Sequence, residues 1–433
     1  MKRVLIITYY WPPSGGSGVQ RWLKMSKYLP GYGWQPVVYT TKDAEYPVED
    51  PSLEKEVCPE AEVIRRPIVE PYNFYKRFLG IKKDQKVKAG FIDESGKQKG
   101  WKEKLSVWIR GNLFIPDARC WWVKPSVKYL KKYLKAHPVD ALISTGPPHS
   151  MHLIALKLKK ALNIPWIADF RDPWTEIDFY DELRLSRIAD RKHHRLERQV
   201  LTQADKVVTV SWNWAKGLER LGASKAYVIQ NGYDWDSDAT PQPSLSTEFS
   251  ITYLGIIGAA RNAPALWQAL SALKETEPDF HKNLKINLIG QVDQSVIRDL
   301  QKNGLTENTI IKPPVPHHEV QQLQSASQLL LLLVNNAPNA KGILTGKLYE
   351  YLASGRPILA IGPEDGDAAR VLKETQAGVI VGFEDQKKME EVIKELYHKY
   401  LNGGLPSNES KELEKYSRKA LAGEYATLLD KLS

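Results

Sequence analysis

The amino-acid sequence predicts an α/β protein built from two doubly wound domains. In both halves of the chain, apolar runs of strand length alternate with helix-forming segments, as in parallel sheets covered by helices. A glycine-containing turn follows the first strand of each half, where doubly wound domains bind their ligands. At 433 residues, the chain is also too long for a single hydrophobic core.

The boundary between the domains is predicted from composition. Residues 235–248 are polar and rich in proline and serine, which is typical of a linker. We therefore expect an N-terminal domain at 1–235 and a C-terminal domain at 236–409. Residues 410–433 are predicted to form one long helix, which begins at the N-cap residue Ser410 and returns to the first domain.

The first domain opens with an apolar strand at 4–8, a turn that contains Gly15 and Gly16, and a helix at 19–29. The turn lacks the GxGxxG spacing of dinucleotide-binding domains, which disfavours a dinucleotide ligand. Glycines at such a turn allow a backbone to approach a substrate closely. We therefore place Gly15 and Gly16 beside the substrate.

Two later strands of the first domain end in polar clusters. One leads to His149, and the next leads to the segment that holds Asp169, Arg171 and Asp172. Parallel strands end at a common edge of the sheet, so these clusters are expected to lie together. His149 alone would suit a helix start, because it follows two prolines. Its pairing with the second cluster favours catalysis, and all four residues are our catalytic candidates.

An irregular basic excursion, 67–125, interrupts the alternation of strands and helices. Its densest part, 76–104, holds ten basic and four acidic residues, interspersed with aromatic side chains. Residues 1–235 hold 40 Lys and Arg against 26 Asp and Glu, a net charge of +14, whereas the rest of the chain has a net charge of −4. This mixture suits an anionic membrane or a lipid-linked acceptor. Single-stranded nucleic acid or a merely solvated surface are the alternatives, and no nucleic-acid-binding motif is present.

The segment 341–360 (KGILTGKLYEYLASGRPILA) combines a glycine-containing turn, a helix and a buried strand. Thr345 and Gly346 open the helix, whose first amides are free to bind an anion. Lys347 adds a cation there, and Glu350 lies about one turn further along the same face. A phosphate at the amides and Lys347, with a sugar hydroxyl at Glu350, would use every polar group. A nucleotide-sugar site is therefore predicted, and an ordinary crossover helix is the alternative.

Arg261 is a second candidate cation for a phosphate, because it follows the glycine-containing turn of the second domain. An ordinary surface arginine is the alternative interpretation. His193 and His194 are adjacent and lack the i,i+4 spacing of helical metal ligands, and no acidic metal motif is present. We therefore expect no metal ion and no other cofactor.

Cysteine content and hydropathy indicate the compartment. The chain has two cysteines, Cys58 and Cys120, and no apolar run of membrane-spanning length. Its start, MKRVLIITYY, is predicted to be a strand and not a signal peptide. We therefore expect a cytoplasmic protein that contacts the inner face of the plasma membrane peripherally.

Six motifs occur in an order that resembles the GT-B glycosyltransferases, in particular the retaining enzymes of glycosyltransferase family 4 that build bacterial surface polysaccharides. The motifs are YYWPPSGGSGVQR, STGPPHS, DFRDPW, VIQNGYD, YLGIIGAARN and GKLYEYLASGRPILAIG. The resemblance covers nearly the whole chain. It implies two Rossmann-like domains that face each other across a cleft, the first for the acceptor and the second for the nucleotide sugar.

The resemblance also implies roles for matching residues. Glu350 matches the glutamate that binds the nucleotide ribose, and Arg261 matches a cation that neutralises the diphosphate. Gly15 and Gly16 match the glycine turn beside donor and acceptor.

Two positions depart from the family pattern. Gly342 replaces the other glutamate of the family motif, and Arg171 stands where the family places a histidine. Lys347 is expected to supply the charge of a family cation that is absent near Gly255.

The implied reaction transfers a sugar from a nucleotide-diphosphate donor, such as a UDP-sugar, to a hydroxyl of a lipid-linked or polysaccharide acceptor. The anomeric configuration would be retained, and no metal would be needed. A non-catalytic GT-B-like binding protein and, less favoured, a nucleic-acid-binding protein remain the alternatives.

Overall fold

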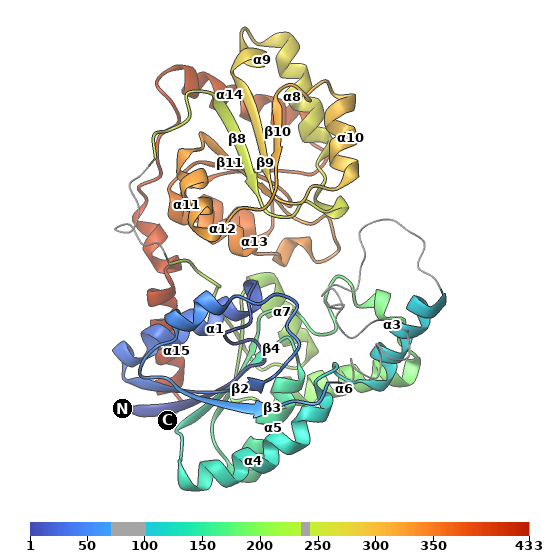
Figure 1. Cartoon of the computed structure of the whole chain (residues 1–433), viewed down its shortest axis with the longest axis vertical. Helices are drawn as coiled ribbons and strands as arrows, with labels where there is room; N and C mark the ends of the chain where they lie inside the picture. The colour runs from blue at the N-terminus through green and yellow to red at the C-terminus, as the bar shows by residue number, and fades with distance from the viewer. Residues whose placement is uncertain (71–100, 235–242, 433) are drawn as a thin grey trace. The chain divides into compact units, whose positions relative to one another are not determined.

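A computed structural model describes the chain over residues 1–70, 101–234 and 243–432. The chain forms two compact units (Figure 1). The N-terminal unit comprises Met1–Asn231 and Arg418–Ser433, and the C-terminal unit comprises Gly232–Ser417. Each contains one parallel sheet with helices packed on it, which confirms the predicted fold class. Most of the basic excursion (71–100) and part of the predicted linker (235–242) lie outside the described residues.

The sheet of the N-terminal unit has the strand order β3-β2-β1-β4-β5-β6-β7. Its strands are β1 (Lys2–Ile7), β2 (Trp34–Lys42), β3 (Glu62–Pro67), β4 (Ala141–Gly146), β5 (Trp166–Phe170), β6 (Lys206–Thr209) and β7 (Ala226–Val228). The order reverses between β1 and β4, which pair in parallel with Val4 opposite Ala141. Doubly wound proteins bind ligands beyond the strand ends at such a point. The turns after β1, β4 and β5 therefore lie where a site is expected.

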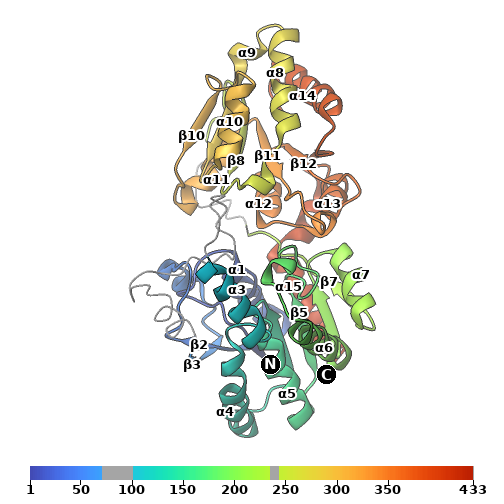
Figure 2. The same ribbon diagram turned by 90° about the vertical axis from the view of Figure 1, so that its right-hand side faces the viewer.

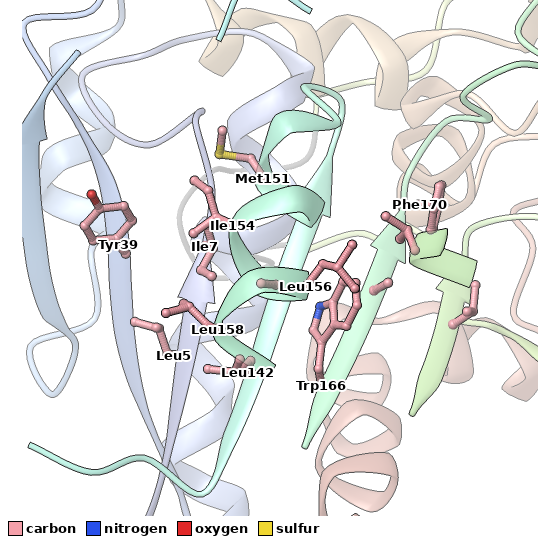
Figure 3. Packing of buried hydrophobic residues seen from close by; sticks show 14 of the residues in the cluster. Leu5, Ile7, Tyr39, Leu142, Met151, Ile154, Leu156, Leu158, Trp166 and Phe170 are labelled. Atoms are coloured by element: carbon pink, nitrogen blue, oxygen red, sulfur yellow. The ribbon is translucent and has the colours of Figure 1, made fainter. Parts of the chain in front are cut away.

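Helices cover both faces of this sheet, because successive side chains of a strand point to opposite sides. On β1, Leu5 and Ile7 join a core with α4 and α5, whereas Val4 and Ile6 join a core with α1 and α15. Figure 3 shows the first of these cores. All four β1 side chains are fully buried, as expected for a parallel sheet covered on both sides. The helices are α1 (Ser17–Tyr28), α3 (Trp101–Leu113), α4 (Val123–Ala136), α5 (Ser150–Leu162), α6 (Arg187–Gln203), α7 (Trp212–Leu221) and α15 (Arg418–Asp430).

The sheet of the C-terminal unit has the order β10-β9-β8-β11-β12-β13 and reverses between β8 and β11. Its core includes Phe249 and Ile251 of β8, packed with Trp267 of α8 and Ile393 of α14. The strands are β8 (Phe249–Leu254), β9 (Leu284–Ile289), β10 (Thr309–Lys312), β11 (Leu329–Leu333), β12 (Ile358–Ile361) and β13 (Gly378–Val381). The helices are α8 (Pro264–Thr276), α9 (Phe280–Asn283), α10 (Gln294–Lys302), α11 (His317–Ala326), α12 (Gly346–Ser354), α13 (Asp367–Thr375) and α14 (Gln386–Leu401).

The C-terminal segment consists of two elements, so the prediction of one long helix is wrong. Ser410 accepts a hydrogen bond from the amide of Glu412 and so caps only a short 3₁₀ helix, η7 (Lys411–Tyr416). The Tyr416 hydroxyl donates to Glu374 Oε2 at 2.6 Å, which keeps η7 in the C-terminal unit. The return to the N-terminal unit, which was predicted, is made by α15. The units divide at 231–232 and 417–418, and not at the predicted 235–236 and 409–410.

A buried ion pair joins α1 and α15 to β5. Arg21 is 2% exposed and Asp169 is fully buried, with Arg21 Nη2 3.0 Å from Asp169 Oδ1. The same carboxylate accepts hydrogen bonds from Trp22 Nε1, Thr145 Oγ1 and the Tyr425 hydroxyl, at 2.7 to 2.9 Å. Burial alone would raise the pKa of Asp169, but Arg21, Trp22 and Tyr425 lower it below its usual range. Asp169 is therefore a charged structural anchor.

We expect Arg21→Met to leave the Asp169 carboxylate buried without its cation. Breaking a buried pair from one side costs about 3 to 5 kcal/mol, so the free energy of unfolding should fall by about that amount in urea denaturation. The control is Arg220→Met, which removes a pair whose side chains are 73% and 42% exposed. That change should cost less than about 1 kcal/mol. Equal stability of the two variants would contradict the anchoring role.

Candidate functional site

In the C-terminal unit, a lysine lies over the turn that follows β8. Gly255 has a φ of +118°, which favours glycine, and a Cβ there would lie 2.5 Å from Lys347 Cε and 2.8 Å from Lys347 Nζ. Lys347 Nζ also donates to the Tyr253 hydroxyl at 3.0 Å. A lysine ammonium has three hydrogens, so this contact leaves it able to bind an anion.

Arg261 reaches the same turn from η5 (Ala259–Arg261). Its Nη1 donates to the carbonyl of Ile256 at 3.0 Å, and its Nε donates to Asn335 Oδ1 at 2.6 Å. These bonds fix the plane of the guanidinium beside the turn. The predicted cations Arg261 and Lys347 are therefore brought to the same turn, although they come from distant parts of the sequence.

The first turn of α12 adds backbone amides to this group. Thr345 occupies the N-cap position, but its side chain makes no capping hydrogen bond. Among the described residues, none pairs with the buried Thr345 Oγ1. The Thr345 side chain therefore leaves the amides of Gly346 and Lys347 uncapped, at the positive end of the helix dipole.

Glu350 lies in the next turn of α12 and is half-buried. Within the described part of the chain, its carboxylate accepts no hydrogen bond. The C-terminal unit thus holds two cations and uncapped amides, followed by an unpaired carboxylate. This set suits a ligand that has phosphate at one end and hydroxyl groups at the other.

In the N-terminal unit, the two predicted glycines have different roles. Gly15 donates its amide to Val48 at 2.9 Å, and a Cβ at Gly15 would lie 3.0 Å from Val48 Cγ1 and 3.1 Å from Asp50 Cβ. Its missing side chain is therefore required by the protein's own packing. Gly16 precedes α1 with a φ of +79°, and a Cβ there would meet no described atom within 4 Å. Gly16 is therefore the glycine with open space beside it.

Arg171 braces the turns that surround it. Its Nη1 donates to the carbonyl of Gly18 at 2.6 Å, Nη2 donates to the carbonyl of Pro147, and its own amide donates to Gly146. Arg171 therefore ties the turn after β5 to the first turn of α1 and to the turn after β4. Among the described residues, none pairs with its buried Nε.

Asp172 and His149 are the other two predicted residues at these turns, and both carry polar groups. Asp172 is half-buried, and burial raises the pKa of its carboxyl group. His149 is 8% exposed and its ring stacks on Trp174 with 4.7 Å between ring centroids. Burial, followed by nearby His152, His193 and Arg171, lowers the pKa of His149 well below its usual value. His149 is therefore neutral at pH 7.

Asp169 was predicted to be catalytic, but all of its visible contacts are structural. Its carboxylate is fully buried and receives hydrogen bonds from four side chains, including Arg21. The described contacts of Asp169 are thus structural, and its catalytic role stays a prediction.

Sequence reasoning missed Asn335, Tyr253, His152 and Gly146. Asn335 directly follows the buried run that contains β11, and a polar residue after a buried strand is a usable signal. His152 lies three residues after His149, on the same face of a helix. The sequence holds no comparable signal for Tyr253 or Gly146, since their roles depend on contacts with other segments.

Residues 1–70, 101–234 and 243–432 lack two kinds of feature. No helix there is both long enough and apolar enough to cross a bilayer. No group of three or more His, Cys, Asp or Glu side chains there could hold a metal ion.

Two family models match the chain consecutively. The Glycosyltransferase Family 4 model matches residues 94–237, and the Glycosyl transferases group 1 model matches residues 237–420. No curated protein matches the chain.

Solved structures are similar over the full length of the chain. Sucrose-phosphate synthase from Thermosynechococcus elongatus is 15% identical with a TM-score of 0.61, and the match covers 100% of this chain and 99% of that chain. HepE from Anabaena, solved with UDP-glucose, is 13% identical with a TM-score of 0.59 and 100% coverage of both chains. A TarM variant from S. aureus, solved with fondaparinux, alpha-GlcNAc-glycerol and UDP, is 11% identical with a TM-score of 0.59. The match covers 99% of this chain and 100% of that chain. At these identities, the likeness shows the fold.

We expect stability to depend on Glu197, which anchors the loop after β5. Thr175 Oγ1 and the Thr175 amide donate to this buried carboxyl group, and burial raises its pKa from 4.5 to about 7. Because the folded state holds the proton more tightly, the free energy of unfolding should fall as pH rises from about 4.5 to 7. The loss from this group is about 3 kcal/mol.

Glu197→Gln should therefore lose less stability than the unmodified protein between pH 5 and pH 8, as measured by urea denaturation at each pH. Glu395→Gln, at a side chain that is 68% exposed, is the control and should follow the unmodified protein. Parallel pH dependence in all three proteins would disprove the raised pKa.

Proposed function

Because the chain belongs to the GT-B glycosyltransferases, with a Family 4 match followed by a group 1 match, we propose that it transfers a sugar from a nucleotide-diphosphate donor to an acceptor hydroxyl. The acceptor is a lipid-linked or polysaccharide molecule of cell-surface glycan synthesis, and the anomeric configuration is retained. The observation that carries the proposal is the meeting of Lys347, Arg261 and the uncapped start of α12 at the turn after β8. Similar folds solved with UDP-glucose and with UDP support a UDP-sugar as the donor.

Charge development explains why these groups are needed. When the bond between the anomeric carbon and the phosphate oxygen breaks, the nucleoside diphosphate leaves with the electron pair. Lys347, Arg261 and the α12 amides are fixed before the reaction, so they stabilise this charge without reorganisation. The proposal assigns that role to side chains and amides, so no divalent ion is required. Glu350, unpaired in the next turn, accepts hydrogen bonds from the ribose hydroxyls.

In the N-terminal unit, His149, Asp172 and Gly16 are proposed to contact the sugar or the acceptor. Asp172 keeps a half-buried carboxyl group, and His149 is a neutral imidazole. Arg171 is assigned a bracing role, because both of its terminal nitrogens bond to backbone carbonyls. Asp169 is left out of the proposed chemistry.

A non-catalytic binding protein is the second candidate function. It is favoured by Gly342, which is buried in η6 (Ala340–Gly342) where the family has a glutamate. It is also favoured by the bracing role of Arg171. Such a protein would bind a nucleotide sugar without cleaving it.

We expect Lys347→Met and Arg261→Met each to lower turnover by at least about 100-fold, the effect of removing one preorganised donor. The measurement is the release of nucleoside diphosphate from UDP-, GDP- and ADP-sugars by the purified protein. Lys388→Met, at an exposed lysine paired with Glu364, is the matched control and should keep full activity. Addition of EDTA should change nothing.

Unchanged turnover in both variants would refute the assignment. Thermal stabilisation by a nucleotide sugar, without any hydrolysis or transfer, would favour the binding protein instead.

We also propose that an apolar and basic edge of the N-terminal unit contacts an anionic membrane. This edge, the α3–α6 edge, combines the end of α3, the loop at 114–122 and the start of α6, and Figure 2 shows α3 and α6 on the same side of the unit. Asn112 Oδ1 accepts from the Ser186 amide at 2.7 Å, and Phe114 packs edge-on against Trp121. The exposed apolar side chains of the α3–α6 edge, with the exposed fraction of each, are Trp108 (42%), Leu113 (64%), Trp121 (53%) and Ile188 (80%).

Charge around these side chains fits a lipid surface. The first turns of α6 expose Arg187, Arg191 and Lys192, and Arg184 is exposed just before the helix. Two acidic residues, Asp181 and Glu182, lie nearby in the sequence. Aromatic rings bury at the headgroup level while basic side chains meet anionic lipids. This arrangement supports a location at the inner face of the plasma membrane.

We expect the double variant Trp108→Ser/Trp121→Ser to bind vesicles of phosphatidylcholine and phosphatidylglycerol at least about tenfold more weakly than the unmodified protein. The assay is co-sedimentation, and binding should weaken with salt and with pure phosphatidylcholine. Ile311→Ser/Leu401→Ser removes apolar side chains of similar exposure, 45% and 55%, from the C-terminal unit as a control. Equal binding by both double variants would exclude this edge, and tight binding of a single-stranded oligonucleotide at the edge would favour nucleic acid.

A further inference from the structure

A buried chain of hydrogen bonds runs from β5 through β4 to α5. Trp166 Nε1 donates to Ser144 Oγ at 2.8 Å, and Ser144 Oγ lies 2.8 Å from His152 Nδ1. All three side chains are fully buried. An indole N–H only donates, so the serine oxygen already accepts one bond and keeps its single hydrogen for the histidine.

Two ring nitrogens lie unpaired just beyond this chain. Among the described residues, none pairs with His152 Nε2 or His149 Nδ1, although both atoms are buried. A Cβ at Gly146 would lie 2.6 Å from His152 Nε2 and 2.9 Å from His149 Nδ1. The two nitrogens therefore face the same small space, and their separation cannot exceed the sum of these distances. A direct bond or one shared water molecule spans such a gap.

If the two ring nitrogens hydrogen-bond directly to each other, one arrangement of hydrogens satisfies all of these groups. If Ser144 donates to His152 Nδ1, the hydrogen of His152 lies on Nε2, which borders the same small space as His149 Nδ1. His149 then accepts at Nδ1 and carries its own hydrogen on Nε2. The reverse arrangement leaves the Ser144 hydroxyl hydrogen buried and unpaired, which costs free energy.

We propose that Ser144 and His152 are positioning residues that hold His149 as its Nε2–H tautomer, so that His149 donates a hydrogen bond to an oxygen of the bound sugar. His149 Nε2 is the outer nitrogen of the ring, and Trp174 fixes the ring plane by stacking at 4.7 Å. A group in this state donates a hydrogen bond and does not act as a base. The choice of a sugar oxygen as the ligand rests on the proposed glycosyltransferase function, whereas the tautomer does not.

Burial keeps both histidines in the neutral state that this arrangement needs. It lowers the pKa of His152 to about 3, with Asp169 and Arg171 acting in opposite directions. Burial also lowers the pKa of His149, and His152, His193 and Arg171 lower it further. Neither ring carries a second proton at pH 7.

The test is nuclear magnetic resonance of the full chain labelled with ¹⁵N-histidine, because ring ¹⁵N shifts distinguish the two neutral tautomers. Signals are assigned with His149→Gln and His152→Gln. We expect both histidines to be Nε2–H tautomers at pH 7. An Nδ1–H tautomer at His149 in the unmodified protein would overturn the proposal.

Ser144→Ala should then shift the tautomer populations of His152 and His149 and lower kcat for nucleotide-sugar cleavage by about tenfold, the factor that corresponds to one hydrogen bond. Ser26→Ala is the control, because Ser26 is also fully buried and its hydroxyl donates to the carbonyl of Leu23 within its own helix. Unchanged tautomers in Ser144→Ala would refute the positioning role of Ser144 and His152. Nε2–H tautomers at both histidines in a protein that does not cleave nucleotide sugars would uphold the positioning role and reject the glycosyltransferase function.

Discussion

Parallel strand pairing is the constraint on which both groups of candidate residues depend. It places the carboxyl ends of all strands of a sheet along one edge, and each sheet reverses its strand order once. In the N-terminal unit the reversal lies between β1 and β4, and the turns that hold Gly16 and His149 follow those strands. In the C-terminal unit it lies between β8 and β11, where Lys347 and Arg261 meet the turn after β8. Residues that are far apart in the chain become neighbours for this reason alone.

The two units use burial in different ways. The C-terminal group keeps its cations at the surface of a turn, each held by one or two hydrogen bonds and still able to meet an anion. In the N-terminal group, burial keeps His149 and His152 neutral. Which ring nitrogen carries the hydrogen then decides whether each nitrogen donates or accepts a hydrogen bond. One group is therefore suited to a phosphate, and the other to uncharged hydroxyl groups.

Strand–helix alternation was enough to predict the fold class and most elements, because strands buried on both faces are continuous apolar runs. Residues whose roles depend on distant partners were harder to predict. Asp169 has the expected position for a catalytic carboxylate, yet its donors Arg21 and Tyr425 come from the two ends of the chain. Ser410 is a correct N-cap, but a cap does not tell how long the helix behind it will be. Lys347 was predicted as a phosphate-binding cation from its position in the first turn of a helix. Its contact with Gly255 could not be predicted, because it depends on the packing of α12 against the turn after β8.

The return of α15 to the N-terminal unit has a consequence for the order of folding during synthesis. Tyr425 donates to Asp169 and accepts from Arg21, and Leu421 and Leu429 complete the core on one face of the first sheet. The ribosome releases α15 only after the whole C-terminal unit. Until then the nascent N-terminal half exposes the apolar surface that α15 covers and lacks one partner of its buried charges, a state prone to aggregation. The N-terminal unit therefore completes its core and its buried charge network only after α15 has been synthesised.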